Sequence, residues 1–204
     1  MDCTHIPEIS CFYSDTIASH ILNPSAHFEY EMILVTDGSA QVQIHDRTYP
    51  LQRGSLLFIS RLEQHQFCIV KEPYCRYVLS VSSDLLLSHL NEPRLASIFM
   101  QRPEYFSHVV QLNEEQLAYF LPFFQKSADE YEKQPDFYTL QSIAMLLSIL
   151  ISLYRLYPNA FPMEDSSSLS AAVLNAQIYV SRHFNRKLTL QEIADQCFLN
   201  RHTL

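Results

Sequence analysis

The chain has 204 residues, of which 48% are hydrophobic and 18% are charged. This composition excludes an intrinsically disordered chain and is sufficient for one or two domains with a sizeable core. The formal net charge of −8 argues against a protein that binds nucleic acid over its whole surface. Residues 1–168 carry 10 basic and 20 acidic side chains, whereas residues 169–204 carry four basic and two acidic ones. An acidic body and a basic C-terminal segment predict two modules with different partners.

The longest apolar run, residues 143–154, is shorter than the roughly 18–20 residues that span a membrane. The N-terminal segment has neither the cationic start nor the apolar centre of a signal peptide. The five cysteines form no C-x-x-C pair. We therefore expect a cytoplasmic protein with reduced thiols and no membrane partner.

Several short segments in residues 1–83 have the composition of β-strands. Each is rich in β-branched and aromatic residues or alternates apolar with polar ones, and turn signals separate them. These segments are 27–35, 40–45, 55–59, 66–70 and 76–81. Because no helical pattern interrupts them, we expect an antiparallel sandwich or barrel rather than a parallel sheet.

The two glycines of the chain, Gly38 and Gly54, are both expected at turns between strands, where a positive φ is most useful. The sequence thus contains no Gly-rich loop of the kind that cradles phosphates, which excludes nucleotide-binding and kinase-like functions. It contains no G-x-S-x-G or H-E-x-x-H motif either, so neither motif supports a hydrolase or a zincin.

Residues 84–157 predict helices. Asn113 and Gln116 have the spacing of a capped helix start, and this helix is expected to reach Lys133 with a kink or break at Pro122. A second helix over residues 137–157 completes an antiparallel hairpin. This second helix is apolar nearly all round, which predicts either full burial in a monomer or a seam between two copies. We favour a homodimer seam formed by Leu140, Ile143, Leu147, Ile151 and Tyr154.

The C-terminal segment begins with a Pro- and Ser-rich linker and continues as helices. Residues 169–184 are amphipathic, and Thr189 with Glu192 forms the capping-box pattern of a following helix. A tight turn and another capped helix start complete a helix-turn-helix pattern, although any small helical hairpin uses the same caps. In the DNA-binding interpretation, the exposed first turn presents four residues to bases or phosphates: Asn200, Arg201, His202 and Thr203.

Residues 179–204 (YVSRHFNRKLTLQEIADQCFLNRHTL) resemble the opening of the DNA-binding domain of AraC/XylS-type transcription regulators. Asn200 stands where that family most often has Ser, and Phe198 where it often has Gly. The family's DNA-binding domain has two helix-turn-helix units, of which this sequence contains less than one. The resemblance implies a regulator with an incomplete DNA-binding domain, which would bind operator DNA only as the full-length protein.

The β region is similar to the cupin barrel that serves as sensor in this family. Strand parity places His27, Glu29 and Glu31 on one face, and three polar groups on an otherwise apolar strand must line water or a polar cavity. Similarity to metal-binding cupins implies that His27, Glu31 and His65 match three metal ligands, with Ser25 in place of the fourth. We favour a small polar ligand held by Ser25, His27, Glu29, Glu31 and His65 over a metal or an unliganded barrel.

The sequence therefore predicts an α+β protein that is not an enzyme and has no cofactor. Residues 1–95 would form a cupin-like ligand-sensing β-barrel, residues 96–160 a helical dimerisation hairpin, and residues 161–204 a linker and the first helices of a helix-turn-helix domain. The function implied by the resemblance is ligand-responsive transcription regulation by a homodimer that binds an unidentified small-molecule effector. The alternative is a metal-dependent cupin enzyme, a dioxygenase or isomerase, which metal content would reveal.

Overall fold

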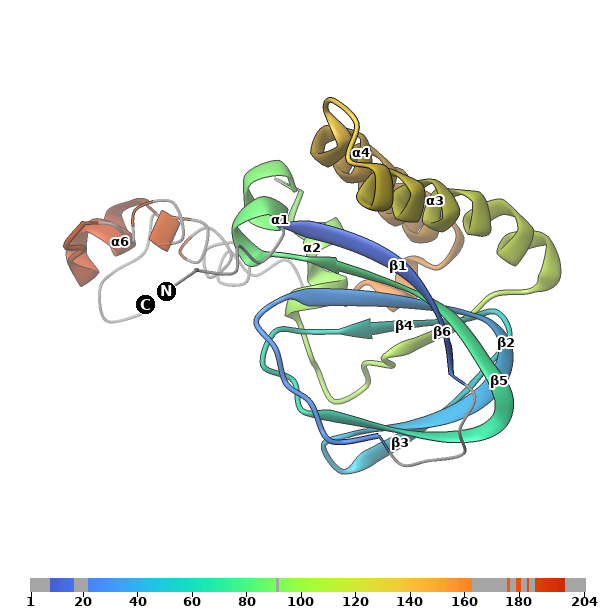
Figure 1. Ribbon diagram of the computed structural model, residues 1–204. Helices are drawn as coiled ribbons and strands as arrows, with labels where there is room; N and C mark the ends of the chain where they lie inside the picture. Colours follow the sequence, from blue (N-terminus) through green and yellow to red (C-terminus); the bar gives the residue numbers. More distant parts are fainter. Residues whose placement is uncertain are drawn as a thin grey trace, which may run out of the picture.

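The computed structural model describes residues 8–16, 22–90 and 92–162, together with residues 176, 179–180, 183 and 186–196. The strands are β1 (Ile9–Thr16), β2 (Tyr30–Ile44), β3 (Arg47–Gln52), β4 (Ser55–Ile59), β5 (His65–Val81) and β6 (Val109–Gln111). The helices are α1 (Ser83–His89), α2 (Pro93–Met100), α3 (Glu114–Lys133), α4 (Tyr138–Leu156), the short 3₁₀ helix η1 (Pro158–Ala160) and α6 (Leu190–Gln196). The chain is therefore α+β, with strands first and most helices after them (Figure 1).

All six strands form one antiparallel sheet in the order β1-β5-β2-β4-β6, with β3 paired to β2. Strands β2 and β5 are long and pair with each other over most of their length. Figure 1 shows that both bend, so that the sheet curls around an inner face. Among the described strands, no hydrogen-bonded ladder joins β1 to β6.

The bend in β2 lies at Gly38, where the sequence predicted a turn between two strands. Gly38 has a φ of +71°, and the register of β2 against β5 shifts on both sides of it. A Cβ atom at this position would lie 2.1 Å from the main-chain oxygen of Pro73. A glycine at positive φ serves a β-bulge as well as a turn, so the predicted segments 27–35 and 40–45 are largely one bent strand. Gly54 lies between β3 and β4, as predicted.

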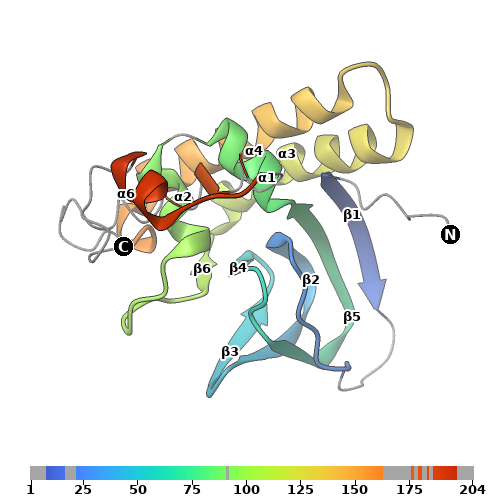
Figure 2. The same cartoon turned by 90° about the vertical axis from the view of Figure 1, so that its left-hand side faces the viewer.

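The two faces of the sheet have separate apolar cores. Along β2, Met32 and Leu34 belong to the outer core, which the helices cover, whereas Ile33 and Val35 belong to the inner core. This alternation is the period of two that a strand buried on both faces displays. Figure 2 shows α3 and α4 lying across the outer side of the curled sheet. The helices therefore contribute to the outer core, whereas the inner core is built from residues of the sheet.

The helical hairpin follows the predicted boundaries closely. Asn113 and Gln116 form a reciprocal capping box at the start of α3, which ends at Lys133. The sequence predicted a kink or break at Pro122, and the break is wrong, because α3 continues through this residue although proline offers no N–H donor. The N-cap of α1 is Ser82, whose hydroxyl accepts from the Leu85 N–H.

Part of the C-terminal segment is described. The Glu192 N–H donates to the Thr189 hydroxyl at 3.2 Å, which is one half of the predicted capping box. The Glu192 carboxylate instead accepts from Tyr179 and Arg186. Most of the predicted helix over residues 169–184 lies outside the described residues, as does the segment after Gln196.

Helix α4 is long and apolar enough to cross a membrane by length and composition alone. In the structure its Ile149, Leu150 and Leu153 side chains are buried in the outer core against the sheet and the other helices. Of the residues in its most apolar stretch, 39% are buried.

Candidate functional site

The structure brings three of the five predicted ligand-binding side chains together at one end of the inner face. One ring nitrogen each of His27 and His65 and one carboxylate oxygen of Glu31 all lie within 4.8 Å of one another. His27 Nε2 is 3.2 Å from Glu31 Oε2, and the two imidazole rings have centroids 5.2 Å apart. Glu31 shares its side of β2 with the inner-core residues Ile33 and Val35, as strand parity predicted, but the same parity argument is wrong for His27 and Glu29, because β2 begins at Tyr30. His27 precedes β2 and reaches the cluster from the connecting segment.

Main-chain carbonyls orient both imidazole rings. Nδ1 of His65 lies 2.8 Å from the Glu63 oxygen, and Nδ1 of His27 lies 3.1 Å from the Glu29 oxygen. A carbonyl only accepts, so each Nδ1 carries a proton and each Nε2 faces the site. The Nε2 of His65 accepts from the Ser25 hydroxyl at 2.8 Å. The buried Nε2 of His27 pairs with the Glu31 carboxylate when the ring is protonated and has no other hydrogen-bond partner among the described residues.

The charges of the three groups depend on one another. Burial alone would raise the pKa of Glu31, but His27 and the Ser80 hydroxyl, which donates at 3.0 Å, hold that pKa below its usual range. The Glu31 carboxylate in turn raises the pKa of His27, against the effect of burial. Burial lowers the pKa of His65. The cluster therefore favours a proton on His27 while His65 stays a neutral acceptor.

A polar groove of about 160 Å³ opens beside His65, and it is lined by Pro24, Gln43, His45, Gln64, His65 and Gln66. Its amide and imidazole groups supply both donors and acceptors, which suit a small polar ligand. The predicted residues Ser25 and Glu29 lie next to this cluster. Ser25 is exposed and bonds to His65, whereas Glu29 contributes its main-chain oxygen and keeps its carboxylate 3.7 Å from His27 Nδ1.

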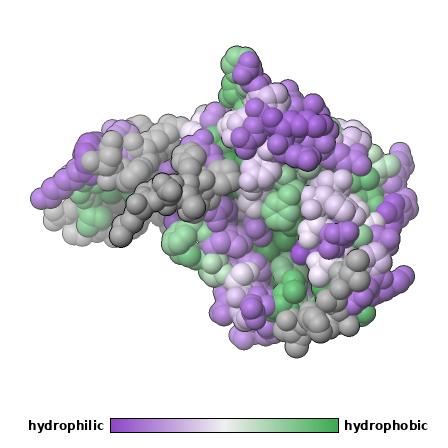
Figure 3. Space-filling model, viewed as in Figure 1, coloured by the Kyte–Doolittle hydropathy of each residue, from purple (hydrophilic) through white to green (hydrophobic). Residues whose placement is uncertain are grey.

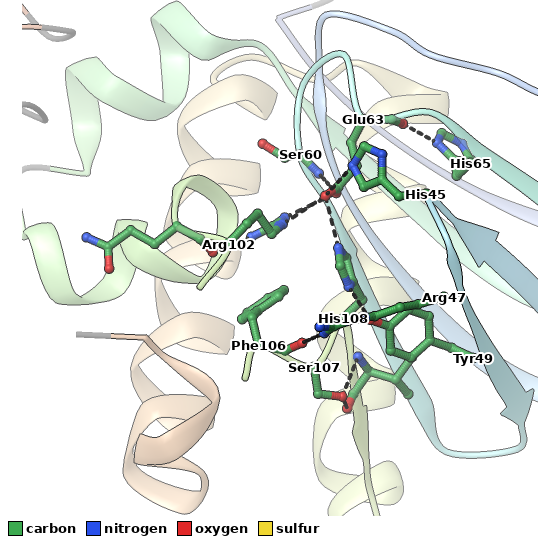
Figure 4. A network of polar contacts seen from close by, with 12 residues as sticks. His45, Arg47, Tyr49, Ser60, Glu63, His65, Arg102, Phe106, Ser107 and His108 are labelled. Carbon is green, nitrogen blue, oxygen red and sulfur yellow. Dashed lines mark hydrogen bonds and ion pairs between the residues drawn. The ribbon is translucent and has the colours of Figure 1, made fainter. Parts of the chain in front are cut away.

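Sequence reasoning missed a second polar cluster, which surrounds the buried carboxylate of Glu63 (Figure 4). This carboxylate accepts from Arg102 Nε at 3.0 Å, from His108 Nε2 at 2.9 Å and from the Ser60 N–H at 2.8 Å. The Tyr49 hydroxyl lies 2.9 Å from the other ring nitrogen of His108. Burial alone would raise the pKa of Glu63, but His108 and Arg102 hold it at about 2. Glu63 is therefore an anion throughout the physiological range.

No spacing rule could have found this second cluster. Glu63 and His108 are 45 residues apart, too far for any helix or strand period to relate them. The one available signal was the position of Glu63 two residues before the predicted site residue His65.

The first cluster fits a divalent transition metal in part. Two imidazole nitrogens and a carboxylate are a suitable donor set, and ring N–H groups held by carbonyls are the usual outer shell of such a site. The Ser25 hydroxyl, however, already bonds to the nitrogen that His65 would offer. A metal would have to displace that hydrogen bond and would be left with open coordination positions.

Helix α4 exposes part of the predicted dimer seam. Leu140 is 57% exposed and Ile151 is 38% exposed, whereas Leu147 and Tyr154 are partly buried against the outer core. Ile143 is only 6% exposed and packs within its own domain, so it belongs to the core rather than to a seam. The all-round apolar pattern of α4 could not separate these faces, because both carry the same residue types.

The four residues predicted to contact DNA, Asn200, Arg201, His202 and Thr203, lie outside the described residues. Their role therefore stays a prediction.

A groove of about 720 Å³ separates the edge strand β1 from the second half of α3. Phe12 and Tyr13 line it and are 46% and 49% exposed. Figure 3 shows apolar side chains on the molecular surface in this region, below the helical hairpin. The groove lies away from the His27 cluster, because the odd-numbered residues of β1 pack toward the helices.

Solved structures of low sequence identity are similar to this chain to different extents. An apo ToxT variant from Vibrio cholerae has 11% identity and a TM-score of 0.51, with 98% of this chain and 73% of that chain covered. The AraC-like transcriptional activator CuxR has 12% identity and a TM-score of 0.46, with 87% of this chain and 59% of that chain covered. A Cupin 2 conserved barrel protein from Salinispora arenicola has 14% identity and a TM-score of 0.35, with 41% and 71% covered.

Among curated proteins, none matches this sequence. The family model described as the AraC-like ligand binding domain matches residues 7–150, which include the whole sheet, the His27 cluster and most of the helical hairpin. This match covers more than half of the chain. The chain therefore belongs to the AraC-like ligand-binding domain family.

Proposed function

We propose that the chain is the effector-sensing part of a transcription regulator and that a small polar molecule binds at His27, Glu31 and His65. The observation that carries this proposal is the convergence of one ring nitrogen each of His27 and His65 and one carboxylate oxygen of Glu31 within 4.8 Å of one another. Such a set of partly buried donors and acceptors suits a small polar ligand. A polar groove lined by His65, though not by His27 or Glu31, lies beside the cluster and would take the remainder of that ligand.

An effector must bind one arrangement of the protein more tightly than another in order to regulate it. The site lies at the ends of β2 and β5, while the helical hairpin lies on the other side of the same sheet. Regulation would follow if ligand binding changed how α3 and α4 present a second subunit and the DNA-binding segment. Closure of the curled sheet into a barrel and the helix-turn-helix unit are further parts of this proposal.

Thermal unfolding in the presence of sugars, amino acids and hydroxy acids, one class at a time, tests the ligand proposal. A genuine effector raises the midpoint of the wild-type protein in proportion to the logarithm of its concentration at saturation. His65→Ala should abolish that rise. The matched control is His89→Ala, which removes an exposed imidazole from α1 and should keep it. A compound that stabilises wild type and His65→Ala equally would contradict this site.

A divalent metal is the second candidate occupant, favoured by the Nε2 nitrogens that both face Glu31. Dialysis against Zn²⁺, Mn²⁺ or Ni²⁺ followed by elemental analysis of the protein measures the stoichiometry. One ion per chain in wild type, lost in Glu31→Gln, would assign a metal site and revive the metal-dependent enzyme as the function. A ratio near zero in wild type would reject it.

The exposed apolar residues Leu140 and Ile151 on α4 support a homodimer that brings two DNA-binding segments together. Leu140→Glu would place a charge in the seam, and sedimentation should then show monomers. Gln125→Glu is the control, because it adds the same charge to an exposed position of α3. A Leu140→Glu variant that sediments like wild type would place the seam elsewhere.

Operator binding belongs to the full-length protein in this proposal. Replacement of Arg201 and His202 together by alanine should weaken binding to an operator fragment without altering effector binding. Unchanged affinity for the operator would remove these residues from the DNA interface.

A further inference from the structure

We propose that Glu63 is a positioning residue that sets the orientation of His27 and His65 and couples it to the helical hairpin. This inference rests on the proposed ligand site at these histidines and adds a route by which that site is regulated. Glu63 would not touch the ligand. Its main chain and the turn around it hold the two imidazole-bearing segments, while its carboxylate holds the segments that lead to α3 and α4.

The first half of the coupling is the turn that joins β4 to β5. The Leu62 N–H donates to the main-chain oxygen of His27 at 2.6 Å, and the Glu63 oxygen accepts from His65 Nδ1 at 2.8 Å. One turn thus holds both imidazole-bearing residues. Leu62 has a φ of +58°, a conformation that a branched apolar residue adopts at a cost. The carboxylate of Glu63 accepts from the Ser60 N–H and so closes the turn in this conformation.

The second half of the coupling consists of the hydrogen bonds that the Glu63 carboxylate accepts from Arg102 and His108, outside the β4–β5 turn. Arg102 donates to it through two nitrogens, at 3.0 and 3.3 Å, and also donates to the Ile98 oxygen at the end of α2. Its guanidinium lies 4.4 Å from the centre of the Phe106 ring. Ile98 itself is fully buried in the outer core with residues of α4. Arg102 therefore connects Glu63 to the helices.

His108 makes the other connection. Its Nε2 lies 2.9 Å from the Glu63 carboxylate, and its main-chain oxygen accepts from the Phe58 N–H in β4. His108 directly precedes β6, which leads within three residues to Asn113, the cap of α3. Figure 4 shows Arg102 and His108 converging on the carboxylate while His65 faces the main-chain oxygen of the same residue. One buried anion thus joins the site to the start of α3 and the end of α2.

The arrangement explains why a buried carboxylate is useful here. A carboxylate is a costly group to bury, and removal of one partner leaves the other charges unsatisfied. Displacement of the turn by a ligand at His65 would disturb Arg102 and His108 together, since both depend on the same two oxygen atoms. If the turn couples the two sites, a substitution at Arg102 should also change the environment of His65.

Nitrogen-15 NMR of the imidazole rings tests the proposal without a ligand, because it reports which ring nitrogen of His65 carries the proton. In wild type we expect the Nδ1–H form alone. Glu63→Gln should give a mixture of forms and raise the hydrogen-exchange rate of the Leu62 amide roughly tenfold, the order expected when one hydrogen bond is lost. Glu104→Gln removes an exposed carboxylate from the connecting segment and should change neither quantity.

A double-mutant cycle separates coupling from general loss of stability. Arg102→Gln should shift the His65 form in the wild-type background and should have no further effect in the Glu63→Gln background. If Glu63→Gln fails to fold, the His65 ring form is measured instead in Tyr49→Phe, which removes only the hydroxyl that contacts His108. A His65 ring that stays wholly in the Nδ1–H form in folded Glu63→Gln, Arg102→Gln and Tyr49→Phe proteins would overturn the proposal.

Failure of the ligand proposal gives a different result. If no polar compound and no metal binds the wild-type protein, the tautomer and exchange measurements still report whether Glu63 positions His65. If a ligand binds but the Arg102–Glu63 double-mutant cycle shows no coupling energy, the ligand site is supported and the positioning role of Glu63 is rejected.

Discussion

The two faces of the curled sheet both bury apolar side chains, but they differ in the polar groups at their edges. The outer face, covered by α1 to α4, is apolar from Ile9 to Phe124, and the buried Glu130 carboxylate of α3 pairs with Lys126 at its margin. The inner face is apolar at its centre, around Val42 and Ile59, and ends in the His27 and Glu63 clusters. The outer face stabilises the fold chiefly through apolar packing, whereas the inner face adds an imidazole–carboxylate cluster and a buried anion. Ionisable groups gathered in this way are candidates for a functional site.

The largest expected effect comes from the outer core. Phe99 is fully buried, and its ring lies 5.6 and 5.8 Å from those of Tyr30 and Phe58. Phe99→Ala should lower the free energy of unfolding by about 3–5 kcal/mol, measured by urea denaturation. The control is Phe28→Ala, at a position that is 66% exposed, where a change within about 0.5 kcal/mol is expected. Equal losses for the two variants would contradict the assignment of the outer face as the stabilising core.

The buried anion gives the next largest effect, and its sign follows from its pKa. Glu63 has a pKa of about 2 in the folded protein against 4.5 when unperturbed, so its contribution is present above pH 4.5 and is lost as the pH falls toward 2. That loss is on the order of 3 kcal/mol. Urea denaturation between pH 5 and pH 2 should therefore show a steeper decline for wild type than for Glu63→Gln. Parallel curves would mean that the carboxylate is not stabilised by Arg102 and His108.

The bend in β2 shapes the inner face and supplies the third test. Gly38→Ala combines a positive φ with a Cβ atom that would meet the Pro73 oxygen at 2.1 Å. We expect a loss of about 1–3 kcal/mol in unfolding free energy, because the strand must shift away from β5. Ser39→Ala, at the next position, is the control and should cost less than about 1 kcal/mol. A fully stable Gly38→Ala protein would show that the bend is not held by this contact.

The sequence predicted the helices better than the bent strands. A helix cap is local, so Asn113 and Gln116 sufficed to locate the start of α3. A bend is decided by the partner strand: Gly38 and Pro73 both look like turn residues in sequence, yet each lies inside a long strand and they meet across the ladder. Period and turn composition alone do not distinguish a hairpin from a bulge.

The sequence could predict the part of the candidate site that lies on a single strand. Parity put Glu31 on the inner face, and similarity to cupins brought in His27 and His65, which the structure places together. The Glu63 cluster was not predictable, because its members come from a turn, the end of α2 and the start of β6. Buried polar networks of high sequence separation have no periodic signature, and only the folded chain reveals them.

The smallest predicted effect contrasts two neighbouring imidazoles. Glu31 raises the pKa of His27 above 6.5, so the stabilisation that His27 contributes is complete below pH 6.5 and is lost as the pH rises through the raised value. Burial lowers the pKa of His65 below 6.5, so its contribution has the opposite sign and is lost as the pH falls. Because the His27–Glu31 pair is partly exposed, each effect on stability should be below about 1 kcal/mol.

NMR titration should nevertheless find the His27 midpoint above 6.5 and the His65 midpoint below it. Glu31→Gln should lower the His27 midpoint most, since the carboxylate is the main cause of the raised pKa; if both midpoints moved equally, Glu31 would face the two rings alike rather than pairing with His27.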